Sequence, residues 1–123
     1  MTKQKTKMNL ETQHKTAVLY ARSASDLQNG NSINNQIATC EAYANRESLK
    51  VIATFSDRAK SGASLVGRDG LTELRDAAKR GEFDAVIVES LDRLSRIQSD
   101  IADLFVDLNQ CGVKILTARG DDR

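Results

Sequence analysis

Hydrophobic positions along this chain alternate between short apolar runs and stretches in which they recur every three or four residues. Four short runs, rich in β-branched residues, predict strands. They cover 16–22, 49–55, 83–89 and 113–117. The helical spacing between them predicts three helices. Their apolar positions are Ile33, Ile37, Cys40 and Ala44, then Leu71, Leu74 and Ala78, then Ile97, Ile101, Leu104, Phe105 and Leu108.

The order of these elements is βαβαβαβ, which predicts an α/β fold. We expect a three-layer sandwich with a four- to five-stranded, mainly parallel sheet flanked by helices. Ser32 and Asp69 are expected to cap helices, and Gly81 and Gly112 to end them. The polar stretch 56–67 is expected to form a loop.

The chain is expected to hold one folded domain, over 16–123. Residues 1–15 are rich in Lys, Thr and Gln and have no apolar core, so they predict a disordered leader and not a signal peptide. The lone His14 lies in this leader and is given no function. No apolar run is long enough to cross a membrane, so we expect a cytoplasmic protein.

Composition limits the ways in which this chain could bind nucleic acid. The formal net charge is only +1, although charged residues make up 28% of the 123 positions. Because phosphate contacts supply most of the affinity for DNA, binding would need a local arginine cluster or another domain. Aromatic residues make up 4% and Trp is absent, which disfavours binding of single strands by stacking. Cys40 and Cys111 are expected as buried thiols, and no residues have metal-ligand spacing, so we expect no cofactor.

Arginines and aspartates follow the predicted strands, where the active groups of such folds gather. A guanidinium binds phosphate through two parallel hydrogen bonds and stays charged, so these arginines are candidates for holding a phosphodiester. The candidates are Arg22, Arg68, Arg93 and Arg96, with Asp57 and Asp92 to orient them or to move protons. The alternative for each arginine is a solvated surface charge, and for each aspartate a cap or a loop salt bridge.

Four segments, in order, resemble the signatures of the serine site-specific recombinases, the resolvase/invertase family. They are Tyr20-Ala21-Arg22, then Ser32 to Gln36, then Ser56-Asp57 with Ser61-Gly62 and Arg68-Asp69-Gly70-Leu71, and finally Leu91-Asp92-Arg93-Leu94-Ser95-Arg96. The resemblance covers about residues 16 to 120, and implies the N-terminal catalytic domain of an enzyme that cuts and rejoins double-stranded DNA. It implies a phosphoserine intermediate, no metal, a homodimer or homotetramer of the full-length protein, and a bacterial, phage or mobile-element origin.

Carried over by position, the four arginines would hold the scissile phosphate, and Gln36, Asp57 and Asp92 would support them. The family's attacking serine, however, falls on Ala24. Side chains alternate along a strand, so Ser23 and Ser25 are expected to point away from the face that Arg22 shares with position 24. Loss of a nucleophile costs on the order of 10⁶ in rate, or ~8 kcal/mol of barrier, so we expect an inactive domain.

The sequence is compatible with several alternatives. The alanine could be natural, or it could have been introduced into the catalytic domain of a larger recombinase. The family usually continues with a dimer-forming helix and a DNA-binding segment, which are expected to lie beyond 16–123. A non-catalytic DNA-binding or assembly module would share the same motifs. A receiver-like signalling domain is disfavoured, because the carboxylates here come with arginines. The resolvase, invertase, integrase and transposase roles are not separable.

Overall fold

The computed structural model describes residues 15–23, 33–58, 69–95 and 97–120. Within them, four strands form one sheet in which every pairing is parallel, in the order β2-β1-β3-β4. The strands are β1 (Thr16–Ser23), β2 (Lys50–Arg58), β3 (Ala85–Val88) and β4 (Lys114–Thr117). The predicted α/β class is confirmed, and the mainly parallel sheet is wholly parallel in the described part of the chain.

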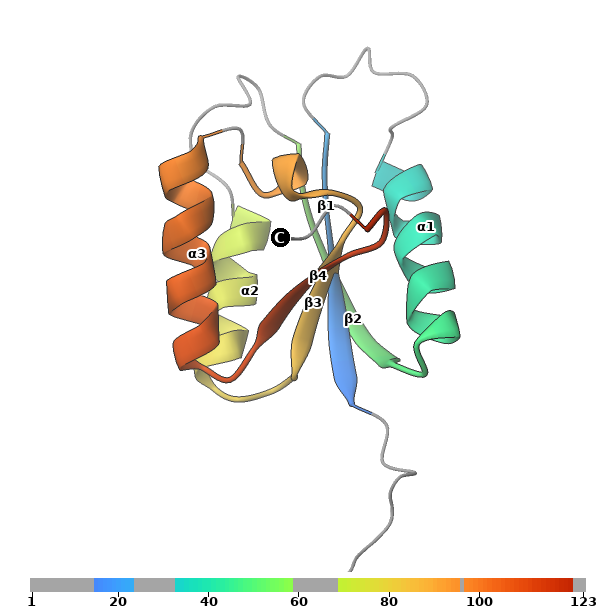
Figure 1. Ribbon diagram of the computed structural model, residues 1–123, viewed down its shortest axis with the longest axis horizontal. Helices are drawn as coiled ribbons and strands as arrows, with labels where there is room; N and C mark the ends of the chain where they lie inside the picture. The colour runs from blue at the N-terminus through green and yellow to red at the C-terminus, as the bar shows by residue number, and fades with distance from the viewer. Residues whose placement is uncertain (1–14, 24–32, 59–68, 96, 121–123) are drawn as a thin grey trace, which may run out of the picture.

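Helices cover both faces of the sheet and complete three layers (Figure 1). Helix α1 (Ile33–Arg46) lies on one face, and α2 (Asp69–Lys79) and α3 (Gln98–Gln110) lie together on the other. A single 3₁₀ turn, η1 (Leu91–Arg93), follows β3. None of the helices in these ranges combines the length and apolarity that crossing a bilayer requires.

Strand β1 lies in the middle of the sheet and is buried on both faces. Its even positions, Val18 and Tyr20, belong to the core formed with α2 and α3, whereas Ala17 and Leu19 belong to the core formed with α1. Residues 17–21 of this strand are all hydrophobic because a parallel strand that is covered by helices on both sides has no solvent-exposed face. The alternation carries Arg22 toward the α2 and α3 face.

Strand β2 is longer than the sequence predicts. The stretch 56–67 was expected to form a loop from Ser56 onward, but β2 continues to Arg58. The physical reason is pairing with β1, in which Arg22 lies opposite Asp57 and Ser23 opposite Arg58. The polar end of β2 is therefore held in the sheet by backbone hydrogen bonds, and it carries Asp57 to the sheet's edge.

The helix ends agree with the glycines in the sequence, whereas one predicted cap is wrong. Gly81 and Gly112 have φ angles of +72° and +78°, in the left-handed region that glycine adopts without strain. Asp69, expected as a cap, is the exposed first residue of α2. The carboxylate that accepts hydrogen bonds from the start of α2 belongs to Asp57. Ser32, the predicted leader up to residue 14 and loop residues 59–67 lie outside the described residues.

Candidate functional site at the carboxyl ends of the strands

The carboxyl ends of the parallel strands bring several of the candidate residues to one edge of the sheet. Arg22 and Asp57 are register partners near the ends of β1 and β2. Asp92 and Arg93 belong to η1, which follows β3. In such folds this edge is where ligands bind, because the loops that leave the strands all begin there.

Arg22 joins β1 to η1 through its side chain. Its Nε donates to the carbonyl oxygen of Arg93 at 3.0 Å, and its Nη2 donates to that of Asp92 at 3.1 Å. These carbonyls end a short helical turn, where a cation interacts favourably with the exposed oxygens. The residue is only 1% exposed. Arg22 thus fixes the position of η1, a structural role that the motif alone did not indicate.

Gln36 fastens the end of β1 from the side of helix α1. Its Oε1 accepts from the backbone N–H of Arg22 at 3.0 Å, and its Nε2 donates to the carbonyl oxygen of Arg22 at 2.9 Å. Strand β3 pairs with β1 only from Ala17 to Leu19, so the amide of Gln36 supplies the partners that a neighbouring strand would otherwise provide. Gln36 is fully buried and acts on the backbone of the signature segment.

Asp57 fixes the start of α2 against the end of β2. Its Oδ1 accepts from the backbone N–H of Gly70 at 2.7 Å, and its Oδ2 accepts from the N–H of Leu71 at 2.9 Å and from the hydroxyl of Tyr20 at 2.7 Å. A carboxylate at a helix N-terminus is favoured by the helix dipole. These two N–H groups of α2 are therefore engaged by the protein's own carboxylate.

Gly70 is required by the close approach of α2 to β2. A Cβ atom at this position would lie 2.3 Å from the carbonyl oxygen of Ser56 and 2.9 Å from its carbon. Both are backbone atoms of a paired strand, so they cannot move aside as a flexible side chain could. The glycine of the Arg68-Asp69-Gly70-Leu71 segment thus has a packing reason that is independent of catalysis.

Arg93 lies beside a buried carboxylate that sequence reasoning missed. Its Nε donates to Oε1 of Glu89 at 3.4 Å, and Arg119 approaches Oε2 of the same carboxylate at 3.6 Å. Glu89 directly follows β3 and is only 4% exposed. The rule that selected Asp57, a carboxylate at the end of a buried strand, would have selected Glu89 as well. Asp92, by contrast, is exposed, and its Oδ1 accepts a hydrogen bond from the Ser90 hydroxyl.

Three predicted site residues, Ala24, Arg68 and Arg96, lie outside the described residues, as does Ser25. Ser23, the other serine beside position 24, is the last residue of β1 and is buried. Of the predicted residues, the structure brings together Arg22, Gln36, Asp92 and Arg93 through hydrogen bonds. Asp57 joins them through the β1–β2 pairing and not through a side-chain contact with an arginine in the described residues.

This edge of the sheet gathers arginines and carboxylates from separate elements. Two guanidinium groups, those of Arg22 and Arg93, lie within one hydrogen-bonded unit. Guanidinium groups hold the oxygens of a phosphate through charge-assisted hydrogen bonds. Throughout the described residues, no three His, Cys, Asp or Glu side chains gather in a way that could hold a metal ion.

Cys40 lies on α1 in the core between that helix and the sheet. Burial raises the pKa of its thiol to about 12, with smaller contributions from the negative charges of Glu89 and Glu41. The thiol is therefore protonated at neutral pH and is a poor nucleophile. This agrees with the expectation of a buried structural thiol; Cys111 is partly exposed.

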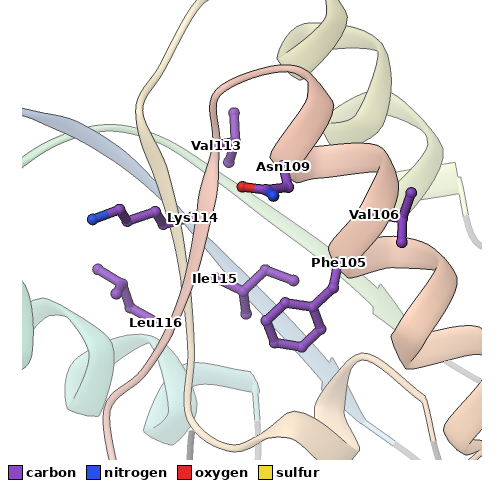
Figure 2. A pocket seen from close by; sticks show the side chains of 7 residues that line it. All are labelled: Phe105, Val106, Asn109, Val113, Lys114, Ile115 and Leu116. Atoms are coloured by element: carbon purple, nitrogen blue, oxygen red, sulfur yellow. The ribbon is translucent and has the colours of Figure 1, made fainter. Parts of the chain in front are cut away.

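A separate hollow of about 430 Å³ lies between α3 and the outer strand β4 (Figure 2). Figure 2 shows Phe105 and Ile115 side by side at its centre, with Val106 on the helix. Among the described residues that line it, most are apolar and Lys114 is the one cation, so they offer no guanidinium group to a phosphate. Of the predicted site residues that the structure describes, none lines this hollow.

A comparison with known proteins finds one family that matches most of the chain. The family model described as "Resolvase, N terminal domain" matches residues 17–123. The C-terminal catalytic domain of ISC1926 TnpA, an IS607-like serine recombinase, is 30% identical with a TM-score of 0.75, covering 85% of this chain and 70% of that chain. The N-terminal catalytic domain of TP901-1 integrase is also 30% identical with a TM-score of 0.75, covering 85% of this chain and 77% of that one.

A third solved structure has the same fold at lower identity. It is a resolvase family site-specific recombinase from Streptococcus pneumoniae, 23% identical with a TM-score of 0.73. The match covers 89% of this chain and 78% of that chain. It supports the architecture alone.

Proposed function

Because this chain belongs to the resolvase family and is a catalytic domain of the serine recombinase kind, we propose that it holds a phosphodiester of double-stranded DNA at the carboxyl ends of its strands. We propose further that it does not cleave that phosphodiester. The residue that would supply the attacking oxygen is Ala24, which has no nucleophilic atom.

The observation that carries this proposal is the junction of β1 with η1. The Arg22 guanidinium binds the carbonyl oxygens of Asp92 and Arg93, which are 70 and 71 positions away in the chain. Two segments that resemble separate signatures are thereby joined at the edge where position 24 follows the strand. In the sequence, position 24 directly follows the strand that carries Arg22.

The residues of the site have different tasks in this proposal. Arg93, together with Arg68 and Arg96, holds the non-bridging oxygens of the phosphate, and Arg22 contributes while it keeps η1 in place. Gln36 fixes the backbone that leads to position 24, since it bonds both the N–H and the carbonyl of Arg22. Asp57 sets the start of α2, directly after Arg68 in the sequence. Asp92 orients the arginines or moves protons.

The missing atom determines which chemical step is lost. In the full reaction, a serine hydroxyl gives up its proton as its oxygen forms an ester bond to phosphorus. A bridging P–O bond breaks at the same time, and the departing deoxyribose oxygen takes up a proton. Without that oxygen, the arginines can still position the phosphate and balance its charge. Loss of the nucleophile nevertheless lowers the rate by on the order of 10⁶. Restoring one hydroxyl at position 24 is therefore expected to restore the first step.

The test uses the full-length gene product and duplex fragments of the genome that carries its gene. The variant Ala24→Ser is expected to give a DNA–protein adduct that survives denaturation in detergent, whereas the unchanged chain is expected to give none. Ala24→Ser combined with Arg93→Gln is expected to lose the adduct, although the fold is kept. Sequencing of the trapped DNA would identify the target.

Two results would count against the proposal. If a folded Ala24→Ser protein forms no adduct under any condition, the site is not a cleavage site that lacks only its nucleophile. An adduct with the unchanged chain would show that another group attacks. The variants Ser23→Ala and Ser25→Ala would then identify it.

A second candidate function is a non-catalytic module that binds DNA or assembles with related chains. Ala24 favours it, and so does the burial of Arg22 and Arg93, which are 1% and 9% exposed. The same fragments distinguish the two candidates. A binding module would bind the DNA without cleaving it, and Ala24→Ser would still give no covalent adduct.

A further inference from the structure

The buried carboxylate of Glu89 has two arginines as partners. Arg93 approaches one of its oxygens from η1 at 3.4 Å, and Arg119 approaches the other at 3.6 Å from the segment that follows β4. The backbone holds this second approach in place, because the N–H of Arg119 donates to the carbonyl oxygen of Glu89 at 3.1 Å. The side chain of Glu89 is 6% exposed. A single buried negative charge thus links two positive charges.

The two arginines differ in their access to solvent. The side chain of Arg93 is 11% exposed, whereas that of Arg119 is 64% exposed. Water screens the exposed guanidinium of Arg119, which weakens its ion pair with the buried carboxylate of Glu89. The pairing of Arg119 with Glu89 is therefore expected to have a small effect while Arg93 remains beside the same carboxylate.

The contribution of Arg119 is expected to increase when Arg93 binds a phosphate. A phosphate competes with Glu89 for the same planar guanidinium. If Arg93 turned to the phosphate and Glu89 had no other partner, a buried carboxylate would be left uncompensated, which is strongly unfavourable. Arg119 is already in place to compensate it.

We propose that Glu89 is a positioning residue for Arg93, and that Arg119 is the second counter-ion that allows Arg93 to leave Glu89 for a DNA phosphate. This inference rests on the proposed function, since it concerns how the phosphate-binding arginine becomes available. It gives Arg119 no contact with the reacting atoms. Arg119 acts through Glu89, and its importance appears only when a phosphate is present.

The first test measures the single-turnover rate of adduct formation in the Ala24→Ser background. Arg119→Gln is expected to slow the rate by on the order of tenfold, within the range for coupled residues of one ion-pair network. Arg119→Lys is expected to restore most of it, because the positive charge returns. In a Glu89→Gln background, Arg119→Gln is expected to have no further effect, since no carboxylate remains to be compensated.

The matched control is Arg80→Gln, which removes the same charge from an exposed arginine. The side chain of Arg80 is 61% exposed and pairs with Glu82, a carboxylate that is itself half exposed. It is expected to leave the rate unchanged, which separates a local effect from loss of general attraction to DNA. An unchanged rate in Arg119→Gln would overturn the proposal, and so would an equal loss with and without the Glu89 carboxylate.

A second measurement needs no cleavage and uses the chain with Ala24. The Nε–Hε signal of Arg93 is followed by nuclear magnetic resonance during titration with inorganic phosphate. The signal is expected to shift, and Arg119→Gln is expected to require several-fold more phosphate for the same shift. No shift in either protein, or equal titrations, would overturn the proposal.

The two measurements fail separately. An adduct from Ala24→Ser with no influence of Arg119 leaves the proposed function standing and removes this inference. If Ala24→Ser gives no adduct but the phosphate titration depends on Arg119, the proposed function is contradicted and the inference about Arg119 stands.

Discussion

Replacing Asp57 by asparagine tests whether this carboxylate holds α2 to the sheet. The carboxylate accepts three hydrogen bonds, from the N–H groups of Gly70 and Leu71 and from the hydroxyl of Tyr20. An amide has a single acceptor oxygen, and its NH₂ group would face a backbone N–H in either orientation. At least one donor at the start of α2 therefore loses its partner.

The expected loss follows from those contacts. A hydrogen bond to a charged group contributes about 1.5–3 kcal/mol. Removal of a negative charge from a helix N-terminus costs about 0.3–1 kcal/mol. Together they predict that Asp57→Asn lowers the free energy of unfolding by about 2–4 kcal/mol, which is a large part of the total for a domain of this size.

The assay is urea unfolding followed by circular dichroism, with an unchanged dependence on urea showing that the two states are the same. Asp69→Asn is the matched control, because Asp69 is an acidic residue in the first turn of the same helix and is exposed. That variant removes the charge alone and is expected to lose about 0.3–1 kcal/mol. If Asp57→Asn loses no more than Asp69→Asn, the carboxylate does not hold the helix and this reasoning is refuted.

Three further predictions concern the same framework. Gly70→Ala is expected to lower the free energy of unfolding by about 1–3 kcal/mol, because its Cβ would overlap the Ser56 carbonyl; an unchanged thermal midpoint would contradict this. Gln36→Leu removes the two hydrogen bonds that this amide makes with the N–H and the carbonyl of Arg22, at about 1–3 kcal/mol each. Gln36→Glu keeps the acceptor but sets a buried carboxylate oxygen against the Arg22 carbonyl, so it is expected to lose at least as much in urea unfolding. The raised pKa of Cys40, about 12 against an ordinary 9.0, stabilises the fold fully below pH 9, and that contribution is lost as the pH rises toward 12. The slope reaches about 1.4 kcal/mol per pH unit, and Cys40→Ala is expected to unfold with a flatter alkaline dependence.

The architecture could be predicted from the sequence because its signals are local. A buried parallel strand is apolar at every position, and the helices between strands repeat at their own period, so β1, α1 and α3 follow from the pattern alone. The end of β2 could not be predicted in this way. Ser56, Asp57 and Arg58 are polar, and they are held in a strand by pairing with β1, a partner that no local pattern reveals.

The sequence indicated several residues that meet at this edge of the sheet, but not the contacts that they make there. Strand-end positions and the family resemblance identified Arg22, Gln36 and Arg93, and the structure brings them together. Their contacts, however, depend on side-chain reach across the fold: Gln36 bonds backbone and not a ligand, and Arg22 bonds the carbonyls of η1. Glu89 was missed because it belongs to no motif, although it occupies a strand end.

The hydrogen bonds of Arg22, Gln36 and Asp57 have a consequence for how this lineage changes over time. Each of these residues holds part of the fold together, whatever it does for a bound phosphate. Selection for a stable domain would therefore preserve them in a descendant that no longer cuts DNA, whereas nothing in these contacts would preserve a serine at position 24. The sequence motifs can therefore persist after the activity is lost. Finding these motifs in a genome indicates ancestry more reliably than it indicates activity.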